Sequence, residues 1–476
     1  MTKKWFLPLT YLAIITGSAF GFAPKAMAQS SRTGFFMETY KYAHQHNAAM
    51  LEDRPYTAIP LVGNVYYNAS TSHPLNAFFY KTANKNGSTD YNFFTEKAVP
   101  EQLFYQRLGN QNVMGNAEFN LNILSFASAF GSGTSLFEVN LRSNGSCEVP
   151  NQLFHYFKNP KLQNDYGFDQ LSLQHRTYGE VALGYAHTVG NHFTVGAKVK
   201  GLMALAYADG KVQDVQVKTG REQWAASGRA FASVAVGNTE FHFDKKGHLQ
   251  EQELKNLSIA PAGWGLATDF GVTYEVHGVE GLTLSAAVTD LGFIHYNKVQ
   301  KLGNEVNRTW TIEDAKKRAT NLVNNGNNPL VPNTDPSAVV KKEFEGELQD
   351  VLALNDNGTA AMTSQLRTTL NLGATYELPF VKHLNVGALY SRYFDGDFQQ
   401  SQLTIGAAWH PIQPIELGLS STFVNNHVNY GAMLTLQAPR FQVFVGTDVI
   451  PTSFGTDGLL ERYAGNINMG ITIPLD

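Results

Sequence analysis

Residues 415–437 read IELGLSSTFVNNHVNYGAMLTLQ, and apolar residues occupy every second position on both sides of a central Asn-Asn-His. Ile415, Leu417 and Leu419 share one parity, and Val428 opens the same pattern after the turn. A period of two is typical of a β-strand whose two faces meet different surroundings. Either a protein core covers the apolar face, as in a soluble sheet, or lipid covers it, as in a membrane barrel.

The same alternation recurs along most of the chain, which favours one large all-β unit. We predict thirteen strands between residues 114 and 476 and a less clear fourteenth within residues 60–83, where 12 or 16 strands remain alternatives. The thirteen alternating segments lie at residues 119–123, 137–141, 181–185, 193–199, 264–274, 282–288, 370–376, 384–390, 403–409, 415–423, 428–436, 441–449 and 467–475.

The connections between these segments decide between the two kinds of sheet. Six alternate connections are short, whereas most of those between them are long, and the longest span residues 208–262 and 297–362. A membrane barrel alternates short periplasmic turns with longer outer loops, and a soluble sandwich has no reason to do so. The sequence therefore predicts a transmembrane antiparallel β-barrel of about 14 strands over residues 60–476, with large extracellular loops.

The N-terminus has the features of a secretory signal peptide. Lys3 and Lys4 precede an apolar run at residues 5–22, and Ala26-Met27-Ala28 matches the small-residue pattern at which signal peptidase cuts. We expect residues 1–28 to be removed and the mature chain to begin near Gln29; an N-terminal membrane anchor is the alternative. Export and the barrel pattern together predict the outer membrane of a Gram-negative cell.

Composition excludes several other classes of protein. A net charge of −4 argues against nucleic acid as a partner, and the single cysteine, Cys147, permits no internal disulfide framework. After residue 28 the sequence has no apolar run of about 18 residues that could span a membrane as a helix. We find no nucleophile elbow and no zinc-protease motif, so we expect neither an enzyme nor a cofactor.

A set of charged residues lies on the parity opposite the apolar one, on consecutive predicted strands. A charge facing lipid costs about 2 to 4 kcal/mol at the bilayer midplane, so these side chains are expected to face the lumen. They can form a structural ladder of cross-strand pairs, an anchor for an internal plug, or a polar path for a substrate. The residues of this lumen polar ladder are Glu118, Glu138, Arg142, Glu180, Lys198 and Lys200.

Residues 29–59 precede the first strand and are too long and too aromatic for a plain tail. FFMETYKYAHQHNAAM in this segment, with IPLVGNVYYNAS, YGEVALGYAHT, GWGLATDFGVTYE and LTLSAAVTDLGFI further on, resembles a family of uncharacterised outer-membrane barrels from Bacteroidota. That family is distantly similar to FadL-type long-chain fatty-acid transporters. The resemblance implies a 14-stranded barrel with an N-terminal hatch, here residues 29–59.

The hatch of the FadL type carries an Asn-Pro-Ala motif, and this sequence has Asn47, Ala48 and Ala49 at the equivalent place. The missing proline removes a conformational restraint, which puts an inherited gating mechanism in doubt. A shared fold does not by itself transmit function.

Two functions are consistent with these observations. The first is a FadL-like transporter or channel for small, hydrophobic molecules, with outer-membrane lipid around it and a small hydrophobic ligand inside it. The second is a non-conducting platform that holds outer-membrane or surface protein partners in a secretion, biogenesis or surface-lipoprotein assembly.

Overall fold

The computed structural model describes residues 31–52, 54–83, 89–159, 164–237, 239–243, 260–311, 313, 354–396, 398–424, 427–450 and 464–475. The expected signal peptide and its cleavage near Gln29 lie outside these residues. The helical elements are η2 (Thr33–Phe36), η3 (Lys41–Gln45), η4 (Ala48–Leu51), η5 (Leu75–Ala77), α2 (Glu101–Leu108) and α3 (Asn151–Lys158).

The first ten strands are β1 (Tyr56–Ala58), β2 (Val65–Thr71), β3 (Phe79–Ala83), β4 (Thr89–Phe93), β5 (Val113–Phe130), β6 (Gly133–Val149), β7 (Asn164–Gly167), β8 (Ser172–Val189), β9 (Phe193–Thr219) and β10 (Gln223–Val236). The other ten are β11 (Gly263–Glu275), β12 (Leu282–Thr311), β13 (Asn355–Gln365), β14 (Thr368–Glu377), β15 (Leu384–Phe394), β16 (Gln400–Ile412), β17 (Ile415–Val424), β18 (His427–Ala438), β19 (Phe441–Thr447) and β20 (Ala464–Pro474).

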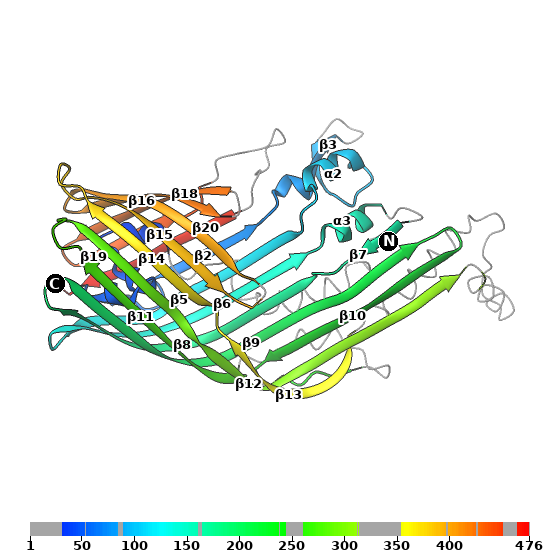
Figure 1. Cartoon of the computed structure of the whole chain (residues 1–476), viewed down its shortest axis with the longest axis horizontal. Coiled ribbons are helices and arrows are strands. Elements are labelled where there is room, and N and C mark those ends of the chain that lie inside the picture. The colour runs from blue at the N-terminus through cyan, green and yellow to red at the C-terminus, as the bar shows by residue number, and fades with distance from the viewer. Residues whose placement is uncertain are drawn as a thin grey trace.

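Eighteen of these strands form one sheet that closes on itself as an antiparallel barrel (Figure 1). Closure occurs where β20 pairs with β1 and β2, and both of these pair with β5. β1 and β2 share one position in the wall, and β7, β10 and β13 lie beyond the barrel rim, which leaves a wall of 14 strands. The predicted fold class and strand number are confirmed.

All thirteen strands expected from the alternation are present, and the uncertain first strand is β1 with β2. The wall begins at Tyr56, four residues before the boundary expected at residue 60. The segment NAFFYKT, which also lies within residues 60–83, contributes β3, and in the described residues β3 pairs only with β4, in a separate hairpin.

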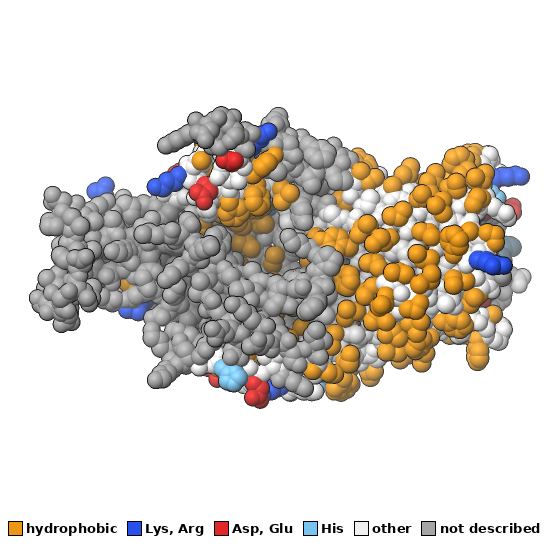
Figure 2. Space-filling view, turned by 180° about the vertical axis from the view of Figure 1, so that it is seen from behind, with side chains coloured by type: hydrophobic (Ala, Val, Ile, Leu, Met, Phe, Trp, Pro, Cys, Tyr) orange, Lys and Arg blue, Asp and Glu red, His pale blue; other side chains and the backbone are white. Residues whose placement is uncertain are grey.

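The outer surface of the barrel is apolar on the predicted parity. Leu417 and Leu419 of β17 are exposed, whereas Glu416 and Ser420, which flank them, are buried. On the face that Figure 2 shows, apolar side chains cover much of the half of the barrel that carries the short turns. Since no protein covers it there, a lipid bilayer is the environment that suits this surface. No helix in the described residues is long and apolar enough to cross a membrane.

Four wall positions continue far beyond the rim and form a curved sheet, which we call the extension. β9 has 27 residues and β12 has 30, whereas about 9 to 11 residues span a bilayer. β10 pairs with the far halves of both, β13 pairs with β12, and β7 pairs with the end of β9. The predicted loops at residues 208–262 and 297–362 are therefore wrong in part, because they contain β10, β13 and the ends of β9 and β12.

The small helices α2 and α3 and the hairpin β3–β4 form a cap beside the mouth of the barrel (Figure 1). An aromatic cluster that includes Phe94, Phe104 and Phe154 holds the cap together. The Lys158 ammonium donates to the carbonyl oxygens of Phe94, Glu96 and Val99 at 2.7–3.0 Å, and burial lowers its pKa. Residues 151–158 of the cap, NQLFHYFK, form α3.

Candidate functional site: the filled lumen

Residues 31–52, which we call the N-terminal segment, lie inside the barrel at the end that carries the short turns (Figure 1, dark blue). The segment folds as three single turns of 3-10 helix, η2, η3 and η4, and makes no strand of its own. Phe35, Phe36, Met37, Tyr40 and Tyr42 are all at most 2% exposed. Together with apolar side chains of the inner wall they make the largest apolar cluster in this half of the barrel.

The wall is shaped for this segment by glycine on its inner face. A Cβ on Gly418 of β17 would meet the Met37 sulfur, and a Cβ on Gly406 of β16 would meet the Phe36 ring. Because only glycine leaves this space, the aromatic side chains come into direct contact with the backbone of the wall. The Gly and Ser residues that separate the apolar positions of residues 415–423 thus form the inner face against which the segment packs.

A single buried carboxylate, Asp448, holds the start of the segment. Its oxygens accept from the backbone N–H groups of Arg32 (3.0 Å) and Thr33 (2.9 Å), from the Thr33 hydroxyl (2.7 Å) and from the Ser31 hydroxyl (3.0 Å). Tyr66 of β2 donates to the same carboxylate at 3.2 Å. Hydrogen bonds to a charged acceptor are the strong ones, so Asp448 is the main anchor of the segment.

A second carboxylate, Glu416 of β17, holds the middle of the segment. It accepts from the backbone N–H groups of Glu38 (2.8 Å) and Thr39 (3.0 Å) and from the Thr39 hydroxyl. Four residues further along β17, the Ser420 hydroxyl lies 2.7 Å from that of Thr33. These contacts use side chains of the wall and leave its backbone ladder intact.

The sequence Asn47-Ala48-Ala49 lies on β9 and β11. Asn47 caps η4 by accepting from the Ala49 N–H at 2.9 Å, and its amide donates to the carbonyl of Val272 at 3.1 Å. A Cβ on Gly271 would collide with the Asn47 side chain, and one on Gly196 with the backbone of Ala48. The capping asparagine fixes the start of η4.

His44 joins the N-terminal segment to the charged residues of the wall. Lys198 donates to His44 Nδ1 at 2.8 Å and lies 3.4 Å from Glu138, while His44 Nε2 lies 3.0 Å from the Tyr56 hydroxyl. Two members of the predicted polar ladder, Glu138 and Lys198, therefore contact the segment directly.

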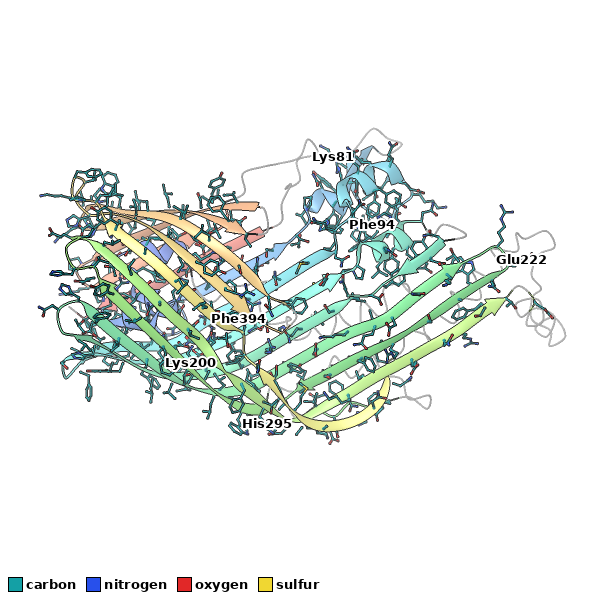
Figure 3. The ribbon with its side chains drawn as sticks, viewed as in Figure 1. Lys81, Phe94, Lys200, Glu222, His295 and Phe394 are labelled. Atoms are coloured by element: carbon teal, nitrogen blue, oxygen red, sulfur yellow. The ribbon has the colours of Figure 1, made fainter. Side chains whose placement is uncertain are left out.

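Three further members of the ladder meet near the middle of the barrel, where Figure 3 labels Lys200. Arg142 of β6 makes a bidentate pair with Asp290 of β12 at 2.9 and 3.0 Å and also bonds Glu180 at 2.7 Å. Lys200 lies 2.6 Å from Asp290 and 2.7 Å from Asp269. Since β6 and β12 are four wall positions apart, these ion pairs cross the lumen and do not only join neighbouring strands.

The last member, Glu118 of β5, belongs to a second group of cross-lumen pairs. It contacts Arg367, which also donates to Asp395 at 3.2 Å, and Arg176 of β8 binds Asp395 at 2.7 Å. We call all of these residues the charged belt. It consists of Glu118, Glu138, Arg142, Arg176, Glu180, Lys198, Lys200, Asp269, Asp290, Arg367 and Asp395, each less than 10% exposed.

A cavity of about 10 Å³ lies among Glu118, Arg142 and Arg367. That volume is about one water-sized sphere, which is too small for an organic ligand. The belt is therefore closely packed at this place.

On the side of the belt nearer the extension, the inner wall becomes apolar and aromatic. Tyr207 of β9 and Tyr296 of β12 lie with their ring centroids 4.7 Å apart, and Arg142 lies over the Tyr178 ring at 5.9 Å. We call this the inner apolar cluster. Its residues are Tyr178, Leu202, Ala204, Tyr207, Ala235, Ala262, Ala267, Ile294, Tyr296, Val299 and Leu366, with Met362 packed against them.

A model of a family of unknown function (DUF5723) matches residues 48–448, which include most of the wall and all of the charged belt. The chain belongs to this family. No curated relative matches it.

Several solved structures share the barrel architecture with this member of the family. A "TodX deltaS2S3 mutant monoaromatic hydrocarbon channel" has a TM-score of 0.42 at 9% identity, with 90% of this chain and 92% of that chain covered. The toluene transporter TbuX of Ralstonia pickettii has 0.41 at 11%, with 90% and 92% covered. A Pseudomonas aeruginosa FadL homologue has 0.41 at 11%, with 94% and 98% covered. These scores describe a loose likeness of shape, and the barrel itself rests on the strand pairing of this chain.

The sequence pointed to the six ladder residues and Asn47 but not to Asp448, Glu416 or Asp290, the second carboxylate that binds Arg142. Glu416 and Asp448 were within reach, because both lie on the inward parity of strands whose outward parity was recognised. Asp290 gave no such signal, since it lies within a register shift between β11 and β12 and its backbone φ is +56°.

Proposed function

We propose that the protein is an outer-membrane channel or transporter for a small hydrophobic molecule, in which the N-terminal segment acts as a hatch. The observation that carries this proposal is the way in which the segment is held. It fills the lumen, yet side-chain hydrogen bonds from Asp448 and Glu416 and glycine contacts anchor it, so its displacement would break no strand of the barrel.

The inner apolar cluster supports a hydrophobic ligand. A molecule entering from the side of the extension would meet the aromatic inner face formed by Tyr178, Tyr207 and Tyr296 before it met the charged belt. Apolar and aromatic linings with a few polar groups are typical of small-molecule sites. The hydrocarbon channels that share the architecture agree with this class of ligand, but the class of ligand is inferred from the cluster.

A reversible lock tests whether the hatch must move. The hydroxyls of Thr33 and Ser420 are 2.7 Å apart, so cysteines at these positions are within reach of a disulfide. We would place Thr33→Cys and Ser420→Cys in a Cys147→Ser background and follow uptake of N-phenyl-1-naphthylamine, an apolar dye, by intact cells. The oxidised protein should admit no dye above vector control, and reduction should restore the level of the parent.

The two single-cysteine variants are the matched controls, and their dye uptake should be the same under oxidising and reducing conditions. Equal uptake by oxidised and reduced double variants would overturn a moving hatch. Uptake by the parent no higher than that of vector control would argue against transport of such molecules.

The charged belt favours one alternative, the non-conducting platform. Cross-lumen pairs such as Arg142 with Asp290 join separated strands of the wall. Such pairs suit a rigid scaffold better than a wide pore. On this alternative the dye uptake of every variant equals that of vector control, and the extension provides the surface for partner proteins.

A further inference from the structure

The extension ends in a strand whose second edge is open. β13 pairs with β12 from Phe293↔Gln365 to Gly303↔Asn355. In the described part of the chain no strand pairs with its other side, because β15 stops at Phe394, opposite Thr368 of β14. Figure 3 labels Phe394 far short of Glu222, which lies near the tip of the extension.

The orientation of the backbone on this edge follows from one hydrogen bond. The Leu366 N–H donates to the Gly292 carbonyl of β12 at 3.0 Å. Since backbone groups alternate sides along an antiparallel strand, Ser364 and Met362 also face β12. Ala361, Thr363 and Gln365 therefore turn their N–H and C=O groups to the open edge.

The composition of the edge is unusual for a strand that ends a sheet. Natural edge strands are protected by lysine, other charges, proline or bulges that twist them away. Residues 359–365 read TAAMTSQ, with no charge and no proline. The register with β12 shifts once before this stretch and once within it, between Ala360 and Met362, whereas residues 362–365 pair with β12 without a shift. An uncharged edge of this kind is suited to pairing.

We propose that this edge binds an extended segment of another polypeptide, which adds to the sheet as a further strand along the line of β15. A second copy of the chain is excluded by symmetry. Copies in one membrane are related by an axis along the membrane normal, whereas antiparallel pairing of one strand with itself needs an axis perpendicular to that strand. Barrel strands tilt only about 35–45° from the normal, so the two requirements conflict.

The chemistry of the edge also limits the partner. Met362 is half-buried and packs against the inner apolar cluster, whereas Ala361 and Thr363 point to the outer, exposed face. The bound strand should therefore carry an apolar residue beside Met362 and polar residues at the alternate positions. Main-chain hydrogen bonds supply the affinity in this mode of recognition, and the apolar position supplies selectivity.

The test uses the full mature protein in detergent and a fluorescein-labelled peptide FIHYNKVQ. This peptide copies residues 293–300 of β12, the natural partner on the first edge of β13. We expect saturable binding by fluorescence anisotropy and, by hydrogen exchange, fast amides at Ala361 and Thr363 that slow at least tenfold with bound peptide. Ala361→Pro, which removes an edge N–H without touching the ladder to β12, should weaken binding at least tenfold.

Ala361→Val keeps the N–H group and is the matched control, so it should bind the peptide like the parent. The proposal fails if the parent shows no saturable binding or if Ala361→Pro binds equally well. It also fails if the edge amides are already protected in the free monomer, which would mean that the chain covers its own edge. Protection that depends on protein concentration would instead indicate a second copy and overturn the proposal.

Discussion

The carboxylate of Asp448 receives more hydrogen bonds from the N-terminal segment than any other group in the described wall. It is fully buried, and it follows β19 at the point where the wall stops pairing on one side. A buried carboxylate is stable only when such donors surround it, so segment and anchor depend on each other. Loosening one should expose the other.

Replacing Asp448 by Asn tests this dependence. The amide cannot accept all of these bonds, and hydrogen bonds to a charged group contribute about 1.5 to 3 kcal/mol each. We expect amide exchange in residues 31–40 to become at least tenfold faster while the barrel strands keep their protection. Asp214→Asn is the control, because Asp214 makes an exposed pair with Arg229 that should contribute little. Unchanged amide exchange in Asp448→Asn would show that Asp448 does not anchor the N-terminal segment.

A pair of glycines on β9 tests the contact between segment and wall. Gly196 lies against the backbone of Ala48, whereas Gly201 faces outward with open space at its Cβ position. Gly196→Leu should displace η4 and make residues 41–51 accessible to added protease, and Gly201→Leu should leave them protected. Equal protection in both variants would mean that the segment does not pack on β9.

Residue-scale contacts were only partly readable from the sequence. Parity shows that Glu118, Glu138 and Lys198 point inward, because a charge in lipid is costly. It cannot show that Arg142 reaches Asp290, since these residues are 148 positions apart and the pairing depends on how the barrel closes. Positions on a face follow from local pattern, but partners across a lumen follow from global geometry.

Among the elements, β9 and β12 show where the alternation stops being informative. Both strands were recognised in their lipid-facing halves, but their far halves, KVQDVQVKT and KLGNEVNRTWT, were assigned to loops. Beyond the bilayer neither face of a strand has to be continuously apolar, so the period of two fades while the backbone pairing continues. The lengths of β9 and β12 were therefore underestimated, and β7, β10 and β13 of the extension were not predicted, whereas the number of strands in the wall was.

The hairpin at β17 and β18 gives a test of orientation at the scale of the element. Leu417 is 43% exposed on the outer face, so Leu417→Arg should prevent or slow assembly into a heat-resistant barrel, because Arg facing lipid costs about 2 to 4 kcal/mol. Gly418→Arg should still assemble but should expel Met37 and Thr33 from the wall. Assembly is read from the gel mobility of unheated samples, and equal behaviour of the two variants would contradict the assigned faces.

For the whole molecule, the barrel combines a lipid-facing exterior with an interior closed at two levels. The N-terminal segment fills the end with the short turns, and the charged belt fastens the middle through pairs such as Arg142 with Asp290. The two levels share a link, since Lys198 contacts both His44 and Glu138. Movement of the segment would thus change the contacts of Lys198 in the belt, and the belt adjoins the inner apolar cluster.

The most direct test is single-channel conductance in planar bilayers for the mature protein, a deletion of residues 30–55, Arg142→Ser, and the two changes together. We expect no conductance from the parent or from Arg142→Ser. The deletion should conduct because His44 no longer holds Lys198, and the combination should conduct more. Silence of both the deletion and the combination would contradict these expectations, because the lumen would then be closed by its own wall and the N-terminal segment would be no hatch.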